Sequence, residues 1–495
     1  MKYLLKGLLA LSFFTIAMST QGQKRTVVMV QVIGAPVDSF STGFYMPDTT
    51  KMYKAITPYE KEAREKEEDR KYVIDLKAPT TKALIGTEAR NPVQEYSYLT
   101  KVFLFLRPGD SLLVSYDIHH QNSTIQFKGR AGTNNKILYE FNRIEPAAFD
   151  NLNFSDSTTP NELMVYTRNV KMSRVKLLNQ NQKRISPALL KYLETKTKLD
   201  FVSGLLGVPM MLNAYFHKEF SKSIPDGYWS FSKLVKIDEH RLKDQDYVAL
   251  LSYTYPYYLL LEQQHANNVL DKDIPREKRY NLMYSIANKT YKNPTVKSVV
   301  LAEILKSLLG ATENATKYRN LLDDYLSNYC KSVSTKQSLL AFYEKRASLA
   351  VGQVPPSFPM EDMQGNKITL AKFKGKVVYM DFWASWCSPC RYEMKEGAPG
   401  LFKKFRDKDV VFLDVSIDDS VTQWKQAVKE LNIDGLQVLS KGGFDSPAAR
   451  TFNIDGIPHY ILIGRDGKIF NNNATRPTQA ETVEAIEKLL KQENE

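Results

Sequence analysis

Residues 377–390 read VVYMDFWASWCSPC and decide the fold of the C-terminal part of the chain. The apolar run Val377–Trp383 predicts a buried strand, and the residues from Cys390 onward predict the start of a helix. A helix N-terminus has unpaired N–H groups and a positive dipole end, and both stabilise a thiolate. Pro389 suits the first helical turn, where its missing N–H costs nothing. The stretch therefore predicts a redox-active pair, Cys387 and Cys390.

Two other interpretations of this cysteine pair find little support in the sequence. Structural zinc needs about four ligands, yet Cys330 is the only further cysteine, and no two of the six histidines have zinc-ligand spacing. A structural disulfide that closes so short a loop would stabilise the chain only weakly. We therefore predict no metal, and no cofactor other than the reversible Cys387–Cys390 disulfide.

Two separate segments resemble the TlpA/ResA branch of the thioredoxin superfamily. The first is Gly375–Glu393, which contains the cysteine pair, and the second is Ile454–Pro458, which is followed by the apolar strand Tyr460–Ile463. The resemblance covers about residues 350–495. It implies an α/β thioredoxin fold in which Pro458 is cis and faces the cysteines. The layout of the whole chain is similar, more loosely, to Bacteroidetes-type proteins.

The resemblance implies a thiol–disulfide oxidoreductase. Cys387 would attack a substrate disulfide, and Cys390 would then attack Cys387 and release the reduced substrate. The implied partners are protein thiols or disulfides and a membrane or soluble thiol electron donor, and we predict a reductase of protein disulfides. Two alternatives stay open: a ligand- or partner-binding protein with a regulatory thioredoxin module, and a thiol peroxidase. Peroxide-reducing relatives usually carry Thr at the position of Ala384, which counts against the peroxidase.

Two acidic residues are predicted to serve the proton chemistry of the pair. The family layout points Asp381 inward from the strand, where burial should raise its pKa and let it accept the proton of Cys390. Glu393 follows Cys390 by three residues on the same helix face, and TlpA/ResA-like proteins use a glutamate there to tune the cysteine pKa values. A surface Asp381 and a solvated Glu393 remain the alternatives.

The predicted substrate-binding surface has five members: Trp386, Ser388, Pro389, Ile457 and Pro458. Trp386 and Pro389 would form an apolar lip around Cys387. Ile457 and Pro458 would offer backbone groups to an extended substrate segment. The resemblance also implies that Pro458 blocks metal capture by the cysteines.

The chain departs from the family pattern at three positions. Lys395 stands where most TlpA-like sequences have Pro, and we expect the helix to be broken or kinked near Pro399 instead. His459 follows Pro458, where Thr is common. Asp381 matches the buried acid of cytosolic thioredoxins, whereas many secreted relatives have an uncharged residue there.

The length of 495 residues predicts several domains. We assign residues 1–22 to a signal peptide, 23–131 to a β-rich domain, 132–348 to a helical domain and 349–495 to a thioredoxin-like domain. The fold class is thus multidomain, with a small β-sandwich-like domain and a mostly α-helical region before the α/β thioredoxin fold. The net charge of +13 lies in the N-terminal part, because acidic and basic residues nearly balance from residue 351 onward. No nucleic-acid-binding motif accompanies it.

Periodic patterns support this division. Strands are predicted at Lys24–Ile33, Tyr98–Leu106, Ser111–Tyr116 and Ser123–Lys128. Helices are predicted at Ala188–Leu206, Tyr247–Gln264, Arg276–Lys289, Thr295–Leu309 and Lys317–Cys330, with Pro209, Pro225, Pro275 and Pro294 between them. The charged stretch Pro58–Arg70 indicates an exposed loop or solvated helix. The tyrosine-rich run Tyr253–Tyr258 favours packing at an interface, with a ligand groove as the alternative.

The first residues predict secretion. Lys2 and Lys6 precede the apolar run Gly7–Met18, which has the length of a signal sequence and is too short to span a bilayer. An uncleaved anchor is the alternative. A lipid anchor would need a cysteine at the cleavage site, and the first cysteine is Cys330. We predict a periplasmic protein without a transmembrane segment after signal removal.

Overall fold

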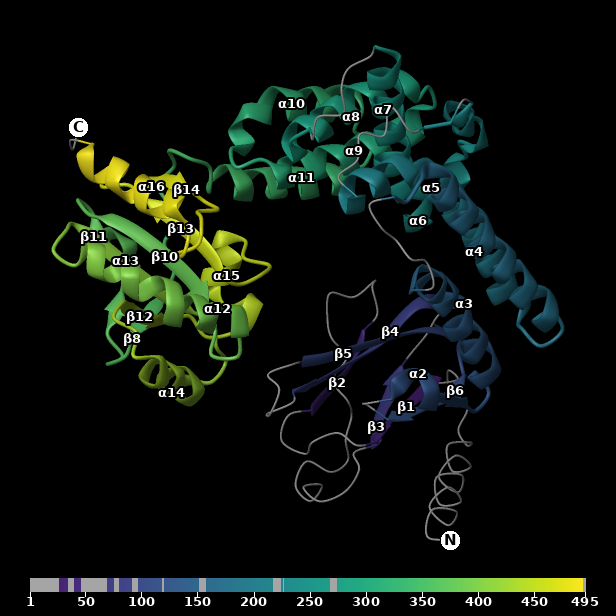
Figure 1. Cartoon of the computed structure of the whole chain (residues 1–495), viewed down its shortest axis with the longest axis horizontal. Coiled ribbons are helices and arrows are strands. Elements are labelled where there is room, and N and C mark those ends of the chain that lie inside the picture. The colour runs from purple at the N-terminus through teal and green to yellow at the C-terminus, as the bar shows by residue number, and fades with distance from the viewer. Residues whose placement is uncertain are drawn as a thin grey trace, which may run out of the picture. The chain divides into compact units, whose positions relative to one another are not determined.

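A computed structural model describes residues 26–33, 40–45, 69–74, 80–90, 97–117, 120–150, 157–216, 224–225, 227–267 and 274–492. The predicted signal peptide and most of the charged stretch Pro58–Arg70 lie outside the described residues. The chain forms two compact units that divide between residues 218 and 226. Figure 1 labels helices and strands of both units. This division falls inside the range that the sequence assigns to one helical domain.

The first unit begins with two β-sheets. Their strands are β1 (Thr26–Ile33), β2 (Phe40–Tyr45), β3 (Asp69–Ile74), β4 (Thr80–Arg90), β5 (Ser97–Leu106), β6 (Ser111–Asp117) and β7 (Gln126–Lys128). One sheet has the order β3-β1-β6-β7 and the other the order β2-β4-β5. Val28 and Val114 of the first sheet share a core with Ile85 and Leu104 of the second. The two sheets therefore pack face to face, as the predicted β-sandwich-like domain requires.

Helices complete the first unit: α2 (Gln121–Thr124), α3 (Gly132–Asp150), α4 (Pro160–Asn181) and α5 (Pro187–Phe216). Arg174 of α4 is buried and joins the three long helices. Its guanidinium lies 2.9 Å from Glu145 of α3 and 2.7 Å from Asp200 of α5. The two carboxylates compensate the positive charge of the buried Arg174 side chain.

The prediction that Pro209 separates two helices is wrong, because Pro209 lies inside α5. The side chains next to it are buried and apolar: Leu205, Leu206, Val208 and Leu212. An interior proline costs roughly 3 kcal/mol. Burial of several large aliphatic side chains contributes more than that, so the helix continues through the proline.

The second unit begins with helices α6 (Gln245–Ala249), α7 (Tyr255–Ala266), α8 (Arg276–Thr290), α9 (Pro294–Ala311), α10 (Arg319–Asn328) and α11 (Val333–Ala347). Buried tyrosines hold them together through hydroxyl groups that donate to backbone carbonyls. Tyr258 donates to Tyr228 at 3.0 Å, and Tyr291 donates to Leu251 at 2.6 Å. The tyrosine-rich run thus contributes to a packed core. No helix among the described residues is long and apolar enough to cross a membrane.

The thioredoxin-like part contains a seven-stranded sheet and five helices. The strands are β8 (Met360–Asp362), β9 (Lys367–Ile368), β10 (Val377–Trp383), β11 (Val410–Ser416), β12 (Leu436–Leu439), β13 (His459–Ile463) and β14 (Ile469–Asn471). The helices are α12 (Ser388–Tyr392), α13 (Ala398–Phe405), α14 (Val421–Leu431), α15 (Pro447–Phe452) and α16 (Ala480–Lys491). The sheet order is β14-β13-β10-β11-β12-β8-β9.

Strand β10 lies in the middle of this sheet and positions the site. Every one of its residues is buried, and it runs parallel to β11 and antiparallel to β13. Met380 and Phe382 face a core that includes α14 and α15, whereas Tyr379 faces a core with α13 and α16. The predicted thioredoxin fold is confirmed, and the cysteine pair follows the C-terminal end of this central strand.

Candidate active site

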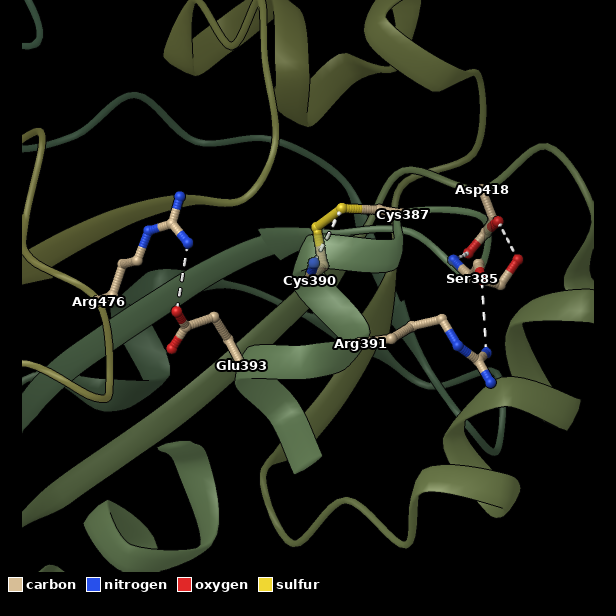
Figure 2. The surroundings of a disulfide bond; sticks show 7 residues. All are labelled: Ser385, Cys387, Cys390, Arg391, Glu393, Asp418 and Arg476. Atoms are coloured by element: carbon tan, nitrogen blue, oxygen red, sulfur yellow. Dashed lines mark hydrogen bonds and ion pairs between the residues drawn. A yellow bond between two sulfur atoms is a disulfide. The ribbon is translucent and has the colours of Figure 1, made fainter. Parts of the chain in front are cut away.

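Cys387 and Cys390 form a disulfide at the start of a helix (Figure 2). Their Cα atoms lie 5.3 Å apart. Cys387 is the N-cap of α12, and its sulfur accepts a hydrogen bond from the N–H of Cys390 at 3.2 Å. Cys390 is completely buried, whereas Cys387 keeps 5% of its surface exposed. Of the two cysteines, Cys387 is therefore the one that keeps some exposed surface.

The loop before Cys387 is held by a buried aspartate that the sequence analysis missed. Asp418 accepts hydrogen bonds from the N–H and hydroxyl of Ser385 at 2.8 and 2.7 Å, and from the hydroxyl of Ser416 at 2.8 Å. Arg391 reaches the carbonyl of Ser385 from the other side at 3.4 Å. These contacts fix the turn between β10 and α12, so the sulfur of Cys387 has a defined position (Figure 2).

The residues predicted to bind substrate are exposed or half-buried. Trp386, Ser388 and Pro389 are exposed, and Ile457 is half-buried against the core that contains both cysteines. The Ile457–Pro458 peptide is cis, as the resemblance implies. These exposures are compatible with the predicted binding surface, and the binding role of each residue stays a prediction.

Phe444 adds an aromatic ring to this surface. It is 44% exposed, and its ring centroid lies 6.1 Å from that of Trp386, which is 38% exposed. Two large exposed aromatic side chains beside a reactive sulfur suit contact with a protein partner. Sequence analysis missed Phe444 because 57 positions separate it from Cys387 and no local motif marks it.

Asp381 lies on β10 and is buried, as expected. It stands opposite Asp414 in the parallel register of β10 and β11, so both carboxyl groups leave the sheet on the same face. Burial raises the pKa of Asp381 well above its ordinary value, and the negative charges of Asp414 and Glu393 raise it further. Its Oδ1 atom has no hydrogen-bond partner among the described residues.

Asp414 is a second buried acid that the sequence analysis missed. Burial raises the pKa of Asp414 to about 7, although a hydrogen bond from the Gln437 amide acts in the opposite direction. The signal that could have found it is an acidic residue in the next parallel strand, VVFLDVS, at the position that pairs with Asp381. Sequence spacing alone does not reveal that register.

Glu393 is buried, and its neighbours come from a distant segment. The regular helix gives way to a π-helical turn at Glu393–Gly397 before α13, so the expected break near Pro399 is present as a π turn. Arg476 lies 3.3 Å from one carboxylate oxygen of Glu393. The hydroxyl of Thr478 donates to the other oxygen at 3.1 Å. The solvated alternative for Glu393 is therefore wrong.

His459 follows the cis proline and also departs from the family pattern. Its side chain has a defined hydrogen-bond partner. Its Nε2 atom lies 2.9 Å from the carbonyl oxygen of Asn472. Burial lowers its pKa, so the neutral imidazole is favoured. In the part of the chain that the structure describes, no cluster of histidine, cysteine and acidic side chains is arranged to hold a metal ion.

Comparisons with known proteins match the C-terminal part of the chain. Residues 350–490 match the Redoxin family model. Thiol-disulfide oxidoreductase ResA of Bacillus cereus (strain ATCC 10987 / NRS 248) is 29% identical over 148 residues, which cover 30% of this chain and 83% of the relative. The thioredoxin domain of a thiol-disulfide oxidoreductase from Bacteroides vulgatus is 34% identical, with 29% of this chain and 99% of that domain covered and a TM-score of 0.26.

A further ResA relative, from a second strain of Bacillus cereus, is 30% identical over 128 residues, which cover 26% of this chain and 72% of the relative. The matched region is the part of the chain that holds the cysteine pair, the buried acids and the cis proline. By this similarity and by its thioredoxin fold, the chain belongs to the TlpA/ResA-like thiol–disulfide oxidoreductases of the thioredoxin family.

Proposed function

We propose that this oxidoreductase works as a reductase of protein disulfides through Cys387 and Cys390. The observation that carries the proposal is the set of three buried acids, Asp381, Asp414 and Glu393, in the part of the chain that holds the pair. Glu393 lies one helical turn after Cys390, and its charge acts on Asp381. A cysteine pair is strongly oxidising when its reduced form is stabilised. Buried carboxylates disfavour a nearby thiolate, which supports a low reduction potential and hence a reductase.

The two sulfurs take different roles in this mechanism. Cys387 is the more exposed residue of the pair, and the helix N-terminus favours its thiolate, which attacks one sulfur of the substrate disulfide. A mixed disulfide forms between Cys387 and the substrate. Cys390 then attacks Cys387 from inside the site, so the second half of the substrate leaves as a thiol. A membrane or soluble thiol donor restores the dithiol.

In this scheme, Asp381 accepts the proton of Cys390 and later returns it. The thiol must lose its proton when it attacks, and a carboxyl group with a raised pKa is a suitable acceptor near neutral pH. The raised pKa of Asp381 and its unpaired Oδ1 support this role. In the return reaction, the protonated acid gives the proton back to Cys390.

The periplasm is the proposed location. The support is the pattern of Lys2, Lys6 and the apolar run Gly7–Met18 at the N-terminus. Cell fractionation of the bacterium that makes this chain tests the location, and we expect the mature protein to be released with the periplasmic contents. Recovery of the unprocessed chain in the cytosol would contradict it.

A trapping experiment tests the division of roles between the cysteines. The free thiol Cys330 is first removed by Cys330→Ser, because it is partly exposed and would react as well. In that background, Cys390→Ser should accumulate a mixed disulfide with a protein substrate, and Cys387→Ser should not. Equal trapping by both variants, or by neither, would contradict the proposed roles.

A further inference from the structure

Three buried carboxyl groups of the thioredoxin-like part form one layer, and the guanidinium of Arg476 makes an ion pair with one of them. Asp381 and Asp414 lie on neighbouring strands, and Glu393 reaches the layer from the helix. Within the described part of the chain, Arg476 makes the only ion pair with any of these carboxyls, at 3.3 Å from Glu393. When the carboxyls ionise, Arg476 is the cation that offsets their charge.

Arg476 is anchored through its backbone. Its carbonyl oxygen accepts a hydrogen bond from the Thr482 hydroxyl at 2.7 Å. The neighbouring carbonyl of Thr475 accepts one from the Tyr379 hydroxyl at 2.6 Å. The Glu393 side chain is only 3% exposed, whereas that of Arg476 is 52% exposed. Loss of the guanidinium would therefore leave an uncompensated buried carboxylate, unlike the loss of an ordinary surface ion pair.

Glu393 is held in place from two sides. Thr478 donates a hydrogen bond to its carboxylate at 3.1 Å. A Cβ atom added to Gly397 would come within 2.7 Å of Cγ2 of Thr478 and 3.0 Å of Oε2 of Glu393. The π-helical turn thus lies directly against the segment that carries Arg476, and glycine is what permits this approach.

We infer that Arg476 is a positioning residue for the resolving step: by holding Glu393 and compensating its charge, it keeps the acid layer able to accept the proton of Cys390 near neutral pH. This inference rests on the proposed role of Cys390. Arg476 acts through Glu393, since the charges that raise the pKa of Asp381, after burial, are those of Asp414 and Glu393.

Apart from the carboxyl group of Asp381, the groups that face Glu393 keep a constant charge. The facing residues are Arg476 and Thr478 from the segment after β14, Asp381 and Tyr379 from β10, and Tyr460 from β13. Burial raises the pKa of both tyrosines far above neutral, so they stay protonated. Of these groups, the one with a raised carboxyl pKa is Asp381.

The balance of the resolving step shows why this matters. The sulfur of Cys390 attacks Cys387, the Cys387–Cys390 bond forms, and the bond between Cys387 and the substrate sulfur breaks. The cysteine pair is oxidised, and the substrate sulfur is reduced and takes a proton from water. The proton of Cys390 passes to a carboxyl group of the acid layer. That carboxyl group can accept the proton only while it is deprotonated. An uncompensated negative charge makes the layer bind this proton already at higher pH.

The test measures the pH dependence of resolution in the full chain. In the Cys330→Ser background, the reduced protein reacts with an aromatic disulfide whose thiolate is coloured. Attack by Cys387 releases the first coloured thiolate, and attack by Cys390 releases the second. With Arg476→Gln, the acid limb of the second phase should move to higher pH by about one unit, which slows resolution about tenfold below the midpoint. Arg476→Lys should restore most of the original profile.

Two controls separate this effect from a general loss of charge or structure. Lys395→Gln removes one positive charge from an exposed position on the same helical turn and should leave the profile unchanged. In a Glu393→Gln background, Arg476→Gln should cause no further shift, because Arg476 acts through Glu393. Should Arg476→Gln fail to fold, Thr478→Val removes the second contact to Glu393 and should shift the midpoint in the same direction by a smaller amount.

The outcomes of this experiment are distinct from those of the trapping experiment. If the parent protein resolves with an acid limb and Arg476→Gln leaves that limb unmoved, the inference is wrong while the proposed function stands. An equal shift with and without Glu393 would also overturn it. If the parent protein never releases the second thiolate, the proposed role of Cys390 itself fails.

Discussion

Two buried aspartates lie near the cysteine pair and differ in how their oxygens are satisfied. Asp418 is fully buried, and its carboxylate accepts three hydrogen bonds from Ser385 and Ser416. Asp381 is almost as buried, but its Oδ1 atom has no partner among the described residues. A buried carboxylate with partners stabilises the loop that it holds. One without partners has a raised pKa and is suited to exchange protons.

The sharpest way to break this comparison is Asp381→Asn. The amide has nearly the same shape, so the fold should stay intact, but it cannot accept the proton of Cys390. General-base catalysis contributes about 10²–10⁴-fold, and we expect resolution to slow by about 100-fold or more at neutral pH. Rapid-mixing kinetics with the reduced protein measure this rate. Unchanged kinetics would remove Asp381 from the mechanism.

Asp418→Ala should have the opposite effect: it should lower the stability of the fold and not cause the kinetic defect of Asp381→Asn. It leaves the N–H and hydroxyl of Ser385 without their acceptor, so the free energy of unfolding should fall by about 3 kcal/mol. Denaturant unfolding of the oxidised protein measures the loss, with Asp418→Asn as the milder companion. A stable Asp418→Ala protein with the kinetic defect of Asp381→Asn would mean that both aspartates are reactive.

Asp414 sharpens the comparison through its pH dependence. Its pKa of about 7 in the folded protein lies above its ordinary value of 3.8. The folded state therefore keeps a proton that the unfolded chain has lost, so stability falls as pH rises from about 4 to 7 and levels off above. Asp414→Asn should remove about 2 kcal/mol of this decrease between pH 5 and 7. Identical pH profiles of unfolding in both proteins would contradict the raised pKa.

The smallest expected effect belongs to the aromatic pair outside the acid layer. Phe444→Ala should raise KM for a protein disulfide about fivefold, because it removes apolar contact area without touching the reacting groups. The rate with a small disulfide should stay the same. A comparable loss with both substrates would place Phe444 in the support of Cys387 instead of in substrate contact.

Local patterns in the sequence are enough to predict much of the thioredoxin-like part. The run Val377–Trp383 is apolar and bounded, so it predicts β10, and Pro389 marks the helix start. The burial of Asp381 is implied by the family resemblance and not by the local pattern, which leaves a surface aspartate open. Pro209 is the counterexample, because the local cost of a proline is offset by the packing of its neighbours, which no local pattern reveals.

The residues that complete the site are separated from the cysteines by long stretches of chain. Asp414 meets Asp381 through the register of two parallel strands. Arg476 and Thr478 meet Glu393 across 83 and 85 positions. Asp418 reaches Ser385 across 33 positions. Such contacts depend on strand register and on the path of the segment after β14, and a single sequence does not specify either.

The most direct test of the account is the reduction potential of the Cys387–Cys390 pair in the purified full chain with Cys330→Ser. Equilibration in dithiothreitol or glutathione buffers of graded composition measures it. The buried acids disfavour a thiolate at the pair, so we predict a value near that of thioredoxin, about −270 mV. A value near −120 mV, as in strong oxidants of this superfamily, would contradict the reductase.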